Sequence, residues 1–308
     1  MKRTTLRSKE LLRSCQKKER EVQKEYRLNR RQIARIYRTE FALLEGYIDF
    51  SLELGRLLDS FIPGKEKPFL QFSLLRIQEH SIKVAREAKI LLENGSGSGA
   101  MARWRTLFEF SVVSNYLIKY PNLAEKYVMY VFVDDYKYAR RLVEFKDKLE
   151  LFDFDLSAFP EIKEDYESVK EKFQWTGKSY EWARNEDVKN PDLLSMARAT
   201  GLEHFYAYVD EAHLYNHPSM HYLLHDRGSQ PPEEQQHYLF SPFDLEVPCQ
   251  LIASSLHQVN GMAILGYSKL ENADSDTLLL YSGMNLQFTQ EIIKAAKKRG
   301  KADRYNNK

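Results

Sequence analysis

The sequence has few of the residues that cross-link a chain or interrupt its helices. Among 308 residues there are 2 cysteines, 13 glycines and 10 prolines. The cysteines, Cys15 and Cys249, lie in dissimilar regions, so we expect neither a disulfide framework nor a cysteine-based zinc site. The low glycine and proline content excludes a collagen-like repeat.

Long apolar runs and targeting signals are also missing. No stretch of 18 apolar residues occurs, so we expect no transmembrane helix. The basic N-terminus lacks the apolar segment and cleavage site of a secretory signal, and acids such as Glu10 and Glu19 argue against a transit peptide. We therefore expect a cytoplasmic protein.

What remains is the composition of a folded chain. Hydrophobic residues make up 43%, aromatic residues 13% and charged residues 29%, which excludes a disordered chain. A fold of this length buries roughly 75% of the surface that its unfolded chain exposes, so it needs no disulfide or structural metal.

The net charge of +2 hides an uneven distribution. Residues 1–39 carry a net charge of +10, residues 294–308 carry +6, and the stretch between them carries −14. A basic arm suits nucleic acid, an anionic membrane surface, or an acidic surface on a partner or on the protein itself. The charge alone leaves these alternatives open.

The basic N-terminal arm also has a helical pattern. Positions along it alternate in steps of three and four residues, and six of the eight are apolar: Leu12, Cys15, Glu19, Val22, Tyr26, Asn29, Ile33 and Ile36. This broken heptad pattern predicts a long helix that packs along another helix. The arm could therefore lie on its own body, form a homodimer or contact nucleic acid.

Almost every later segment also reads as helical, and we predict an all-α fold. Residues 1–62 would form the basic helical arm and the first body helix, 63–299 an all-α, bundle-like body, and 300–308 a basic disordered tail. Glycine, proline and periodicity place the helices near 41–61, 69–93, 100–120, 123–151, 160–173, 192–199, 202–216, 247–268 and 275–298.

The helix predicted at 100–120 carries a charged pair within an apolar stripe. Its apolar side chains surround Arg105, and Glu109 follows one turn later. We expect this helix to be central and Arg105 to be buried. A buried arginine needs acceptors, so the pair is either a structural network or the floor of a cleft that binds an anion such as phosphate.

Histidines are concentrated in one region, where five of the eight lie within 22 residues. In the helix predicted at 202–216, Tyr206, Asp210, His213 and His217 share one face. This face could bind a metal, supply general acid and base groups, or form hydrogen bonds between helices. No second helix offers a matching Glu-x-x-His pattern, so we expect no metal and no cofactor.

A further candidate pair is Arg198 and His204, which have the R-x5-H spacing. This spacing resembles that of HEPN-like ribonucleases, in which the arginine acts on phosphate and the histidine on the 2′-hydroxyl or the leaving group. The match departs from that pattern at Ala199, where a polar residue is usual, and at Gly201, which interrupts the helix between the pair.

The order of the motifs resembles the DUF5677 family, a group of mostly bacterial helical proteins without an assigned reaction. The motifs are Arg105-Thr-Leu-Phe-Glu109, then Tyr180-Glu-Trp182-Ala183, then a tyrosine-rich helix that ends in His217-Pro-Ser219. The resemblance covers about residues 65–270. By position, the matching residues are Arg105, Glu109, Trp182, Tyr208 and His217, while His213 stands where the family favours a small polar residue. The resemblance implies that Arg105, Glu109 and His217 converge in an all-α body.

Two functions fit these observations. In the first, the protein acts on RNA or on a nucleotide phosphate as a metal-independent, ribonuclease-like enzyme, with a role in bacterial defence or as a toxin. Arg105 would neutralise phosphate, Glu109 would orient Arg105, His217 would be the general acid or base, and Tyr208 would bind the substrate. In the alternative, the protein is a non-enzymatic interaction protein whose basic arm forms a homo-oligomer or docks on a helical partner.

Overall fold

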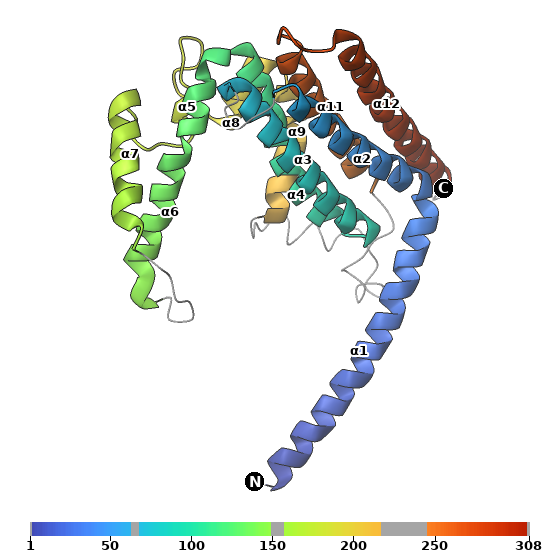
Figure 1. The fold of residues 1–308 in the computed structure, drawn as a ribbon. Coiled ribbons are helices and arrows are strands. Elements are labelled where there is room, and N and C mark those ends of the chain that lie inside the picture. The colour runs from blue at the N-terminus through green and yellow to red at the C-terminus, as the bar shows by residue number, and fades with distance from the viewer. Residues whose placement is uncertain (1, 63–67, 149–156, 217–244, 307–308) are drawn as a thin grey trace.

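The computed structural model describes residues 2–62, 68–148, 157–216 and 245–306, and every regular element within them is helical (Figure 1). The predicted all-α class is therefore confirmed. The α-helices are α1 (Lys2–Ile36), α2 (Arg38–Ser60), α3 (Phe69–Glu93), α4 (Gly97–Lys119), α5 (Ala124–Met129), α6 (Val131–Phe145), α7 (Phe159–Phe173), α8 (Leu193–Thr200), α9 (Tyr206–Asn216), α11 (Glu246–Tyr267) and α12 (Ser275–Asn306). None of the helices in these ranges is long and apolar enough to cross a membrane.

Helix α4 lies at the centre of the body, as its sequence predicts. It packs against α3, α11, α8 and α9. Trp104 is fully buried, and its indole N–H donates to the carbonyl of Leu251 (3.1 Å) and to the hydroxyl of Ser255 (3.0 Å) on α11. These bonds satisfy the one polar group of a large core side chain, so α4 is fixed relative to α11.

Helices α2 and α12 complete the body beside α11. Between them runs a chain of buried polar groups. The Tyr47 hydroxyl donates to Asn285 Oδ1 (2.5 Å), and the Asn260 amide donates to Asn285 Oδ1 (3.2 Å) and Ser51 Oγ (2.9 Å). Because these groups have specific partners, they fix the register of the packed helices.

Helices α6 and α7 form a hairpin that extends from the body (Figure 1). The prediction of a single helix at 123–151 is wrong. After a 3-10 turn (Pro121–Leu123), the chain forms two helices, α5 and α6, which are separated at Tyr130, and α6 ends at Phe145. The Tyr130 hydroxyl donates to the carbonyl of Lys178, and its ring meets Trp175 edge-on at 5.3 Å. Contacts with a distant segment thus accompany a break that no glycine or proline marks.

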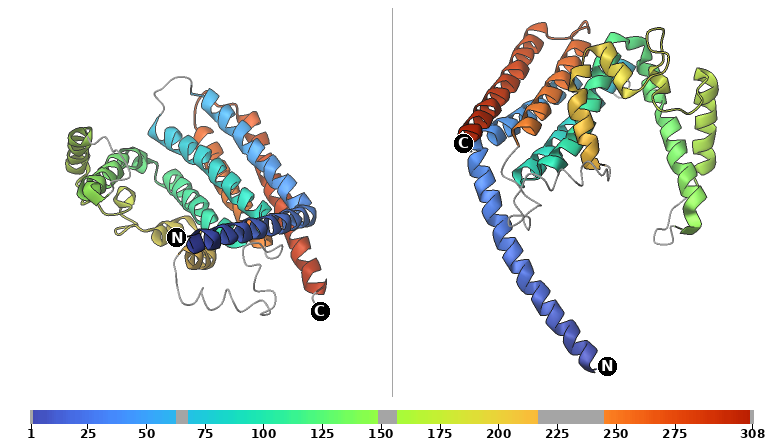
Figure 2. Two further views of the ribbon diagram at one scale, coloured as in Figure 1. Left: turned by 90° about the horizontal axis from the view of Figure 1, so that it is seen from below. Right: turned by 180° about the vertical axis from the view of Figure 1, so that it is seen from behind.

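Where the structure describes the side chains of the basic arm, the contacts with the body lie at its C-terminal end. Ile33 is fully buried, and the Tyr26 hydroxyl donates to Asn94 at the end of α3. Val22, further toward the N-terminus, is 57% exposed. Helix α1 then leads away from the other helices (Figures 1 and 2). The heptad pattern therefore contacts the body over part of its length and continues beyond it.

Candidate functional site

Arg105 and Glu109 lie one turn apart on α4 and are only half-buried. Their side chains are 31% and 30% exposed, so the expectation of a fully buried arginine is wrong. Both residues lie at the edge of the apolar stripe, next to the half-buried Ala102 and Thr106, rather than along its middle. The neighbouring Phe108 is fully packed, and its ring lies 6.3 Å from that of Tyr206 on α9.

Arg105 is held by a histidine from α9. Its Nε donates to Nε2 of His213 at 2.6 Å. An arginine only donates hydrogen bonds, so Nε2 of His213 is the acceptor and carries a lone pair. The ring proton of His213 is therefore on the other nitrogen, Nδ1. The structure thus brings together two residues 108 positions apart in the chain.

Glu109 is held by a tyrosine from another segment. The Tyr180 hydroxyl donates to Glu109 Oε1 at 2.5 Å, whereas Glu109 Oε2 lies 4.0 Å from Nη1 of Arg105. Burial and the negative charge of Glu109 raise the pKa of Tyr180, so its hydroxyl stays protonated as a donor. Glu109 therefore has its strongest described bond with Tyr180 and only a longer ion pair with Arg105.

The backbone of Tyr180 is in the left-handed region, with φ at 60°. Such a conformation costs a residue other than glycine roughly 1 to 3 kcal/mol, so the surrounding structure must enforce it. The next residue, Glu181, is buried and accepts three consecutive backbone N–H bonds, from Thr176, Gly177 and Lys178 (2.7–2.9 Å). This carboxylate organises the segment that presents Tyr180 to Glu109.

Trp182 packs in the core rather than beside Arg105. It is buried, with its ring edge-on to Tyr127 (4.7 Å) and Tyr116 (6.1 Å). The Tyr116 hydroxyl donates to the carbonyl of Ala183 (2.8 Å). Trp182 and Ala183 therefore fix the chain next to Tyr180 against α4, and in this way they help to position Tyr180.

The remaining candidates on α9 do not all face Arg105. Tyr206 is near enough that the positive charge of Arg105 acts on its pKa, although burial and Asp192 raise that pKa overall. Tyr208 is exposed and lies about 200° around the helix from Tyr206, on a different face. Asp210 is also exposed, and His217 lies outside the described residues.

Arg198 and His204 are both exposed and lie on either side of Gly201. Gly201 ends α8 in the left-handed conformation (φ 76°), and His204 Nδ1 lies 3.2 Å from its carbonyl. Arg198 lines a shallow cavity of about 630 Å³ together with Lys119, Lys189 and acidic neighbours. The described contacts do not join Arg198 or His204 to Arg105, Glu109, Tyr180 or His213.

Among the described residues, no group of three or more His, Cys, Asp or Glu side chains is arranged to hold a metal ion. The structure instead adds Tyr180, which was not among the predicted site residues. Its place in the Tyr180-Glu-Trp182-Ala183 motif was the signal that could have found it.

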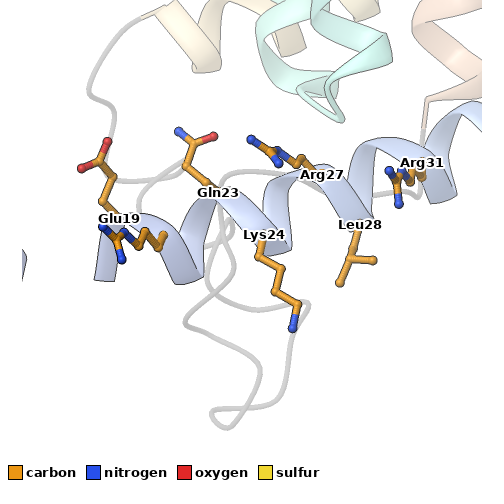
Figure 3. A pocket seen from close by; sticks show the side chains of 7 residues that line it. Glu19, Gln23, Lys24, Arg27, Leu28 and Arg31 are labelled. Carbon is orange, nitrogen blue, oxygen red and sulfur yellow. The ribbon is translucent and has the colours of Figure 1, made fainter. Parts of the chain in front are cut away.

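A second cavity, of about 610 Å³, follows the basic arm (Figure 3). The described residues that line it belong to α1, and four of them are basic: Arg20, Lys24, Arg27 and Arg31, with Glu19, Gln23 and Leu28. Figure 3 shows that Arg27 and Lys24 point to different sides of the helix. The arm thus presents positive charge around its circumference rather than in a single pocket.

Comparison with known proteins gives one match. A family described as "Family of unknown function (DUF5677)" matches residues 74–234, more than half of the chain. The match contains Arg105, Glu109, Tyr180 and His213. No curated protein and no solved structure matches this chain.

Proposed function

The chain belongs to the DUF5677 family, whose function is unknown, and we propose that it binds a phosphate group of RNA or of a nucleotide at Arg105 and acts on it without a metal ion. The contact between Arg105 and His213 carries this proposal. This contact fixes the orientation of a partly exposed guanidinium through the Nε of Arg105. A phosphate that binds the two terminal nitrogens does not need Nε.

The outer edge of Arg105 supports anion binding. Among the contacts of the described residues, the nearest to its terminal nitrogens is Glu109 at 4.0 Å, which is beyond hydrogen-bonding distance. Glu109 stays at that distance while it accepts from Tyr180. The two terminal nitrogens can therefore donate together to two oxygens of one phosphate, the geometry in which arginine binds oxyanions most strongly.

The chemistry proposed for RNA is transesterification. The 2′-oxygen attacks phosphorus, the bond to the 5′-oxygen breaks, a base takes the 2′-hydroxyl proton, and an acid returns a proton to the 5′-oxygen. Arg105 stabilises the charge on the phosphate, and His213 positions Arg105. The proton transfers are assigned to His217, four residues after His213 in the sequence.

The test is cleavage of labelled single-stranded RNA by the purified chain in EDTA. We expect Arg105→Ala to lower the rate about 100-fold or more, as loss of an oxyanion-stabilising donor does. Arg103→Ala is the matched control, since Arg103 lies on the same helix, is similarly exposed and pairs with Glu87 (2.5 Å). Equal rates for the two variants, or activity that survives His217→Ala, would show that the cleavage does not come from this site.

The alternative function, docking through the arm without catalysis, is favoured by the exposed basic side chains of α1. For RNA as the docked molecule, each phosphate contact contributes about 0.7 to the slope of log affinity against log salt concentration. Replacing Arg20 and Lys24 by glutamine should then reduce the slope by about 1.4. Replacing Arg76 and Lys83 on α3 is the control and should leave it unchanged. An unchanged slope in the α1 variant would exclude these contacts with RNA and favour a protein partner.

A further inference from the structure

Helix α12 has two faces of different character. One face packs against α11 and α2 and buries Leu278, Asn285, Thr289, Ile292 and Ala296. The opposite face is exposed from the beginning of the helix to Lys298. Figures 1 and 2 show α12 at the outer edge of the body, so this face has no neighbour among the described helices.

The middle of the exposed face is flanked by apolar side chains. Leu279 and Leu280 are 73% and 62% exposed, and Met284 and Leu286 are exposed as well. Gly283 lies among them, and a Cβ atom at this position would meet no heavy atom within 4 Å. At 100° per residue, Leu279 and Leu286 lie on one side of the line through Gly283 and the exposed Gln287, and Leu280 and Met284 lie on the other. So many exposed apolar side chains within two turns of one helix are unusual for a surface that contacts only water. A missing side chain at the centre also permits close approach by another backbone.

The ends of the same face carry opposite charges. Asp276 lies in the first turn, preceded by Asp274, whereas Lys294, Lys297 and Lys298 lie toward the other end. Lys294 also pairs with Glu291 one turn before it (3.4 Å), so three lysines and one glutamate leave this end with a net positive charge. Asp276 and Lys294 lie on one line along the helix, because their separation of 18 positions makes about five full turns. The face is therefore acidic at its start, flanked by apolar side chains in its middle and net basic at its end.

We propose that this face binds the same face of a second copy of the chain, with the two α12 helices antiparallel. A two-fold axis across the helix places the acidic start of one copy beside the basic end of the other, twice in each dimer. With Asp276 opposite Lys294 of the partner subunit, the centre of the pair falls at the level of residue 285 along the helix, between Gly283 and Gln287 on the exposed face. The surface supplies its own complement in charge, which an unrelated partner would have to match separately.

The dimer would leave both the Arg105 site and the arm outside the interface, so it does not depend on the proposed function. Helices α1 and α4 carry none of the interface residues. Dimerisation through the arm predicts the opposite dependence: it is lost when the arm is removed. The two modes can therefore be separated by deletion of residues 1–24, which keeps the Tyr26 contact with the body.

The first experiment measures the mass of the full chain by light scattering and its dissociation constant by sedimentation. We expect a dimer, and we expect Leu279→Glu combined with Leu286→Glu to raise the dissociation constant on the order of 100-fold or more, because it introduces carboxylates into an apolar contact. Ile90→Glu is the control, since Ile90 is 51% exposed on α3 and lies outside the face. A monomeric wild-type chain at about 100 µM, or a double variant as dimeric as the control, would overturn the proposal.

The second experiment tests the antiparallel register and does not depend on the apolar variant. Asp276→Lys should weaken the dimer because it places a lysine beside Lys294 of the partner subunit, and adding Lys294→Asp should restore the wild-type constant. Circular dichroism should show equal helix content in all variants, since both positions are exposed. Absence of rescue by the double exchange would refute the register, and a mass that falls to the monomer on deletion of residues 1–24 would refute the α12 interface.

Discussion

Replacing Glu181 by alanine tests how the site is held together. The Glu181 carboxylate accepts the backbone N–H groups of residues 176–178 and the hydroxyl of Thr176 (2.7 Å). A net hydrogen bond to a charged group contributes roughly 1.5 to 3 kcal/mol, and the contributions of neighbouring bonds do not add fully. We therefore expect the substitution to destabilise this segment by about 3 kcal/mol.

The effect depends on pH in a defined direction. Burial alone would raise the pKa of Glu181, but its four hydrogen bonds outweigh burial and lower the pKa below the ordinary value of 4.5. A lowered pKa in the folded state means that the stabilisation is fully present above pH 4.5 and is lost as the pH falls through the lowered value. The difference between wild type and Glu181→Ala should accordingly shrink in acid.

Hydrogen exchange measured by mass spectrometry provides the local assay. A loss of about 3 kcal/mol corresponds to roughly 100-fold faster exchange of the amides at 176–178. Glu186→Ala is the control, because Glu186 is an exposed acid in the same part of the chain. Amide protection in Glu181→Ala equal to that of the control would refute the conclusion that this carboxylate organises the segment.

Three further substitutions or reactions test the packing. Gly266→Ala should destabilise the body by about 1 to 3 kcal/mol in urea unfolding, because the added Cβ would lie 2.2 Å from a methyl carbon of Leu74; wild-type stability would contradict that close approach. Asp192→Ala should cost about 1 kcal/mol through loss of the capping box at the start of α8, visible as faster amide exchange there, and an unchanged rate would argue against the cap. In a Cys15→Ser background, Cys249 should resist alkylation until the chain is unfolded, because burial raises the pKa of its thiol; rapid reaction of the native protein would show that this part of the core opens.

The sequence predicted helices best where local signals mark both ends. The expected helix at 69–93 has the observed bounds of α3, because Pro68 precedes it and Asn94-Gly95 ends it. The helix expected at 192–199 shifts by one residue because Asp192 is its N-cap. Such signals act over a few residues and can be read without knowledge of the fold.

The breaks that the sequence did not predict accompany contacts between distant segments. Tyr130 separates α5 from α6 and is bonded to Lys178, 48 residues away. The helix expected at 202–216 likewise begins as a 3-10 turn at Glu203–Phe205 before α9, and Phe205 in this turn packs against Phe108 (5.9 Å). At these positions, packing between distant segments of the folded chain overrides the local preference for a continuous helix.

For the site, too, the sequence predicted which residues share a helix face but not which faces meet in the fold. Helical spacing placed Arg105 and Glu109 on one face, and it placed Tyr206 and His213 on one face of another helix. Spacing could not show that the two faces meet, or that Tyr180, held in a strained backbone conformation, would bind Glu109. His213 is the residue that holds Arg105. A short serine side chain at this position could not make the contact without movement of α9 toward α4, so the orientation of Arg105 depends on the length of the side chain at position 213.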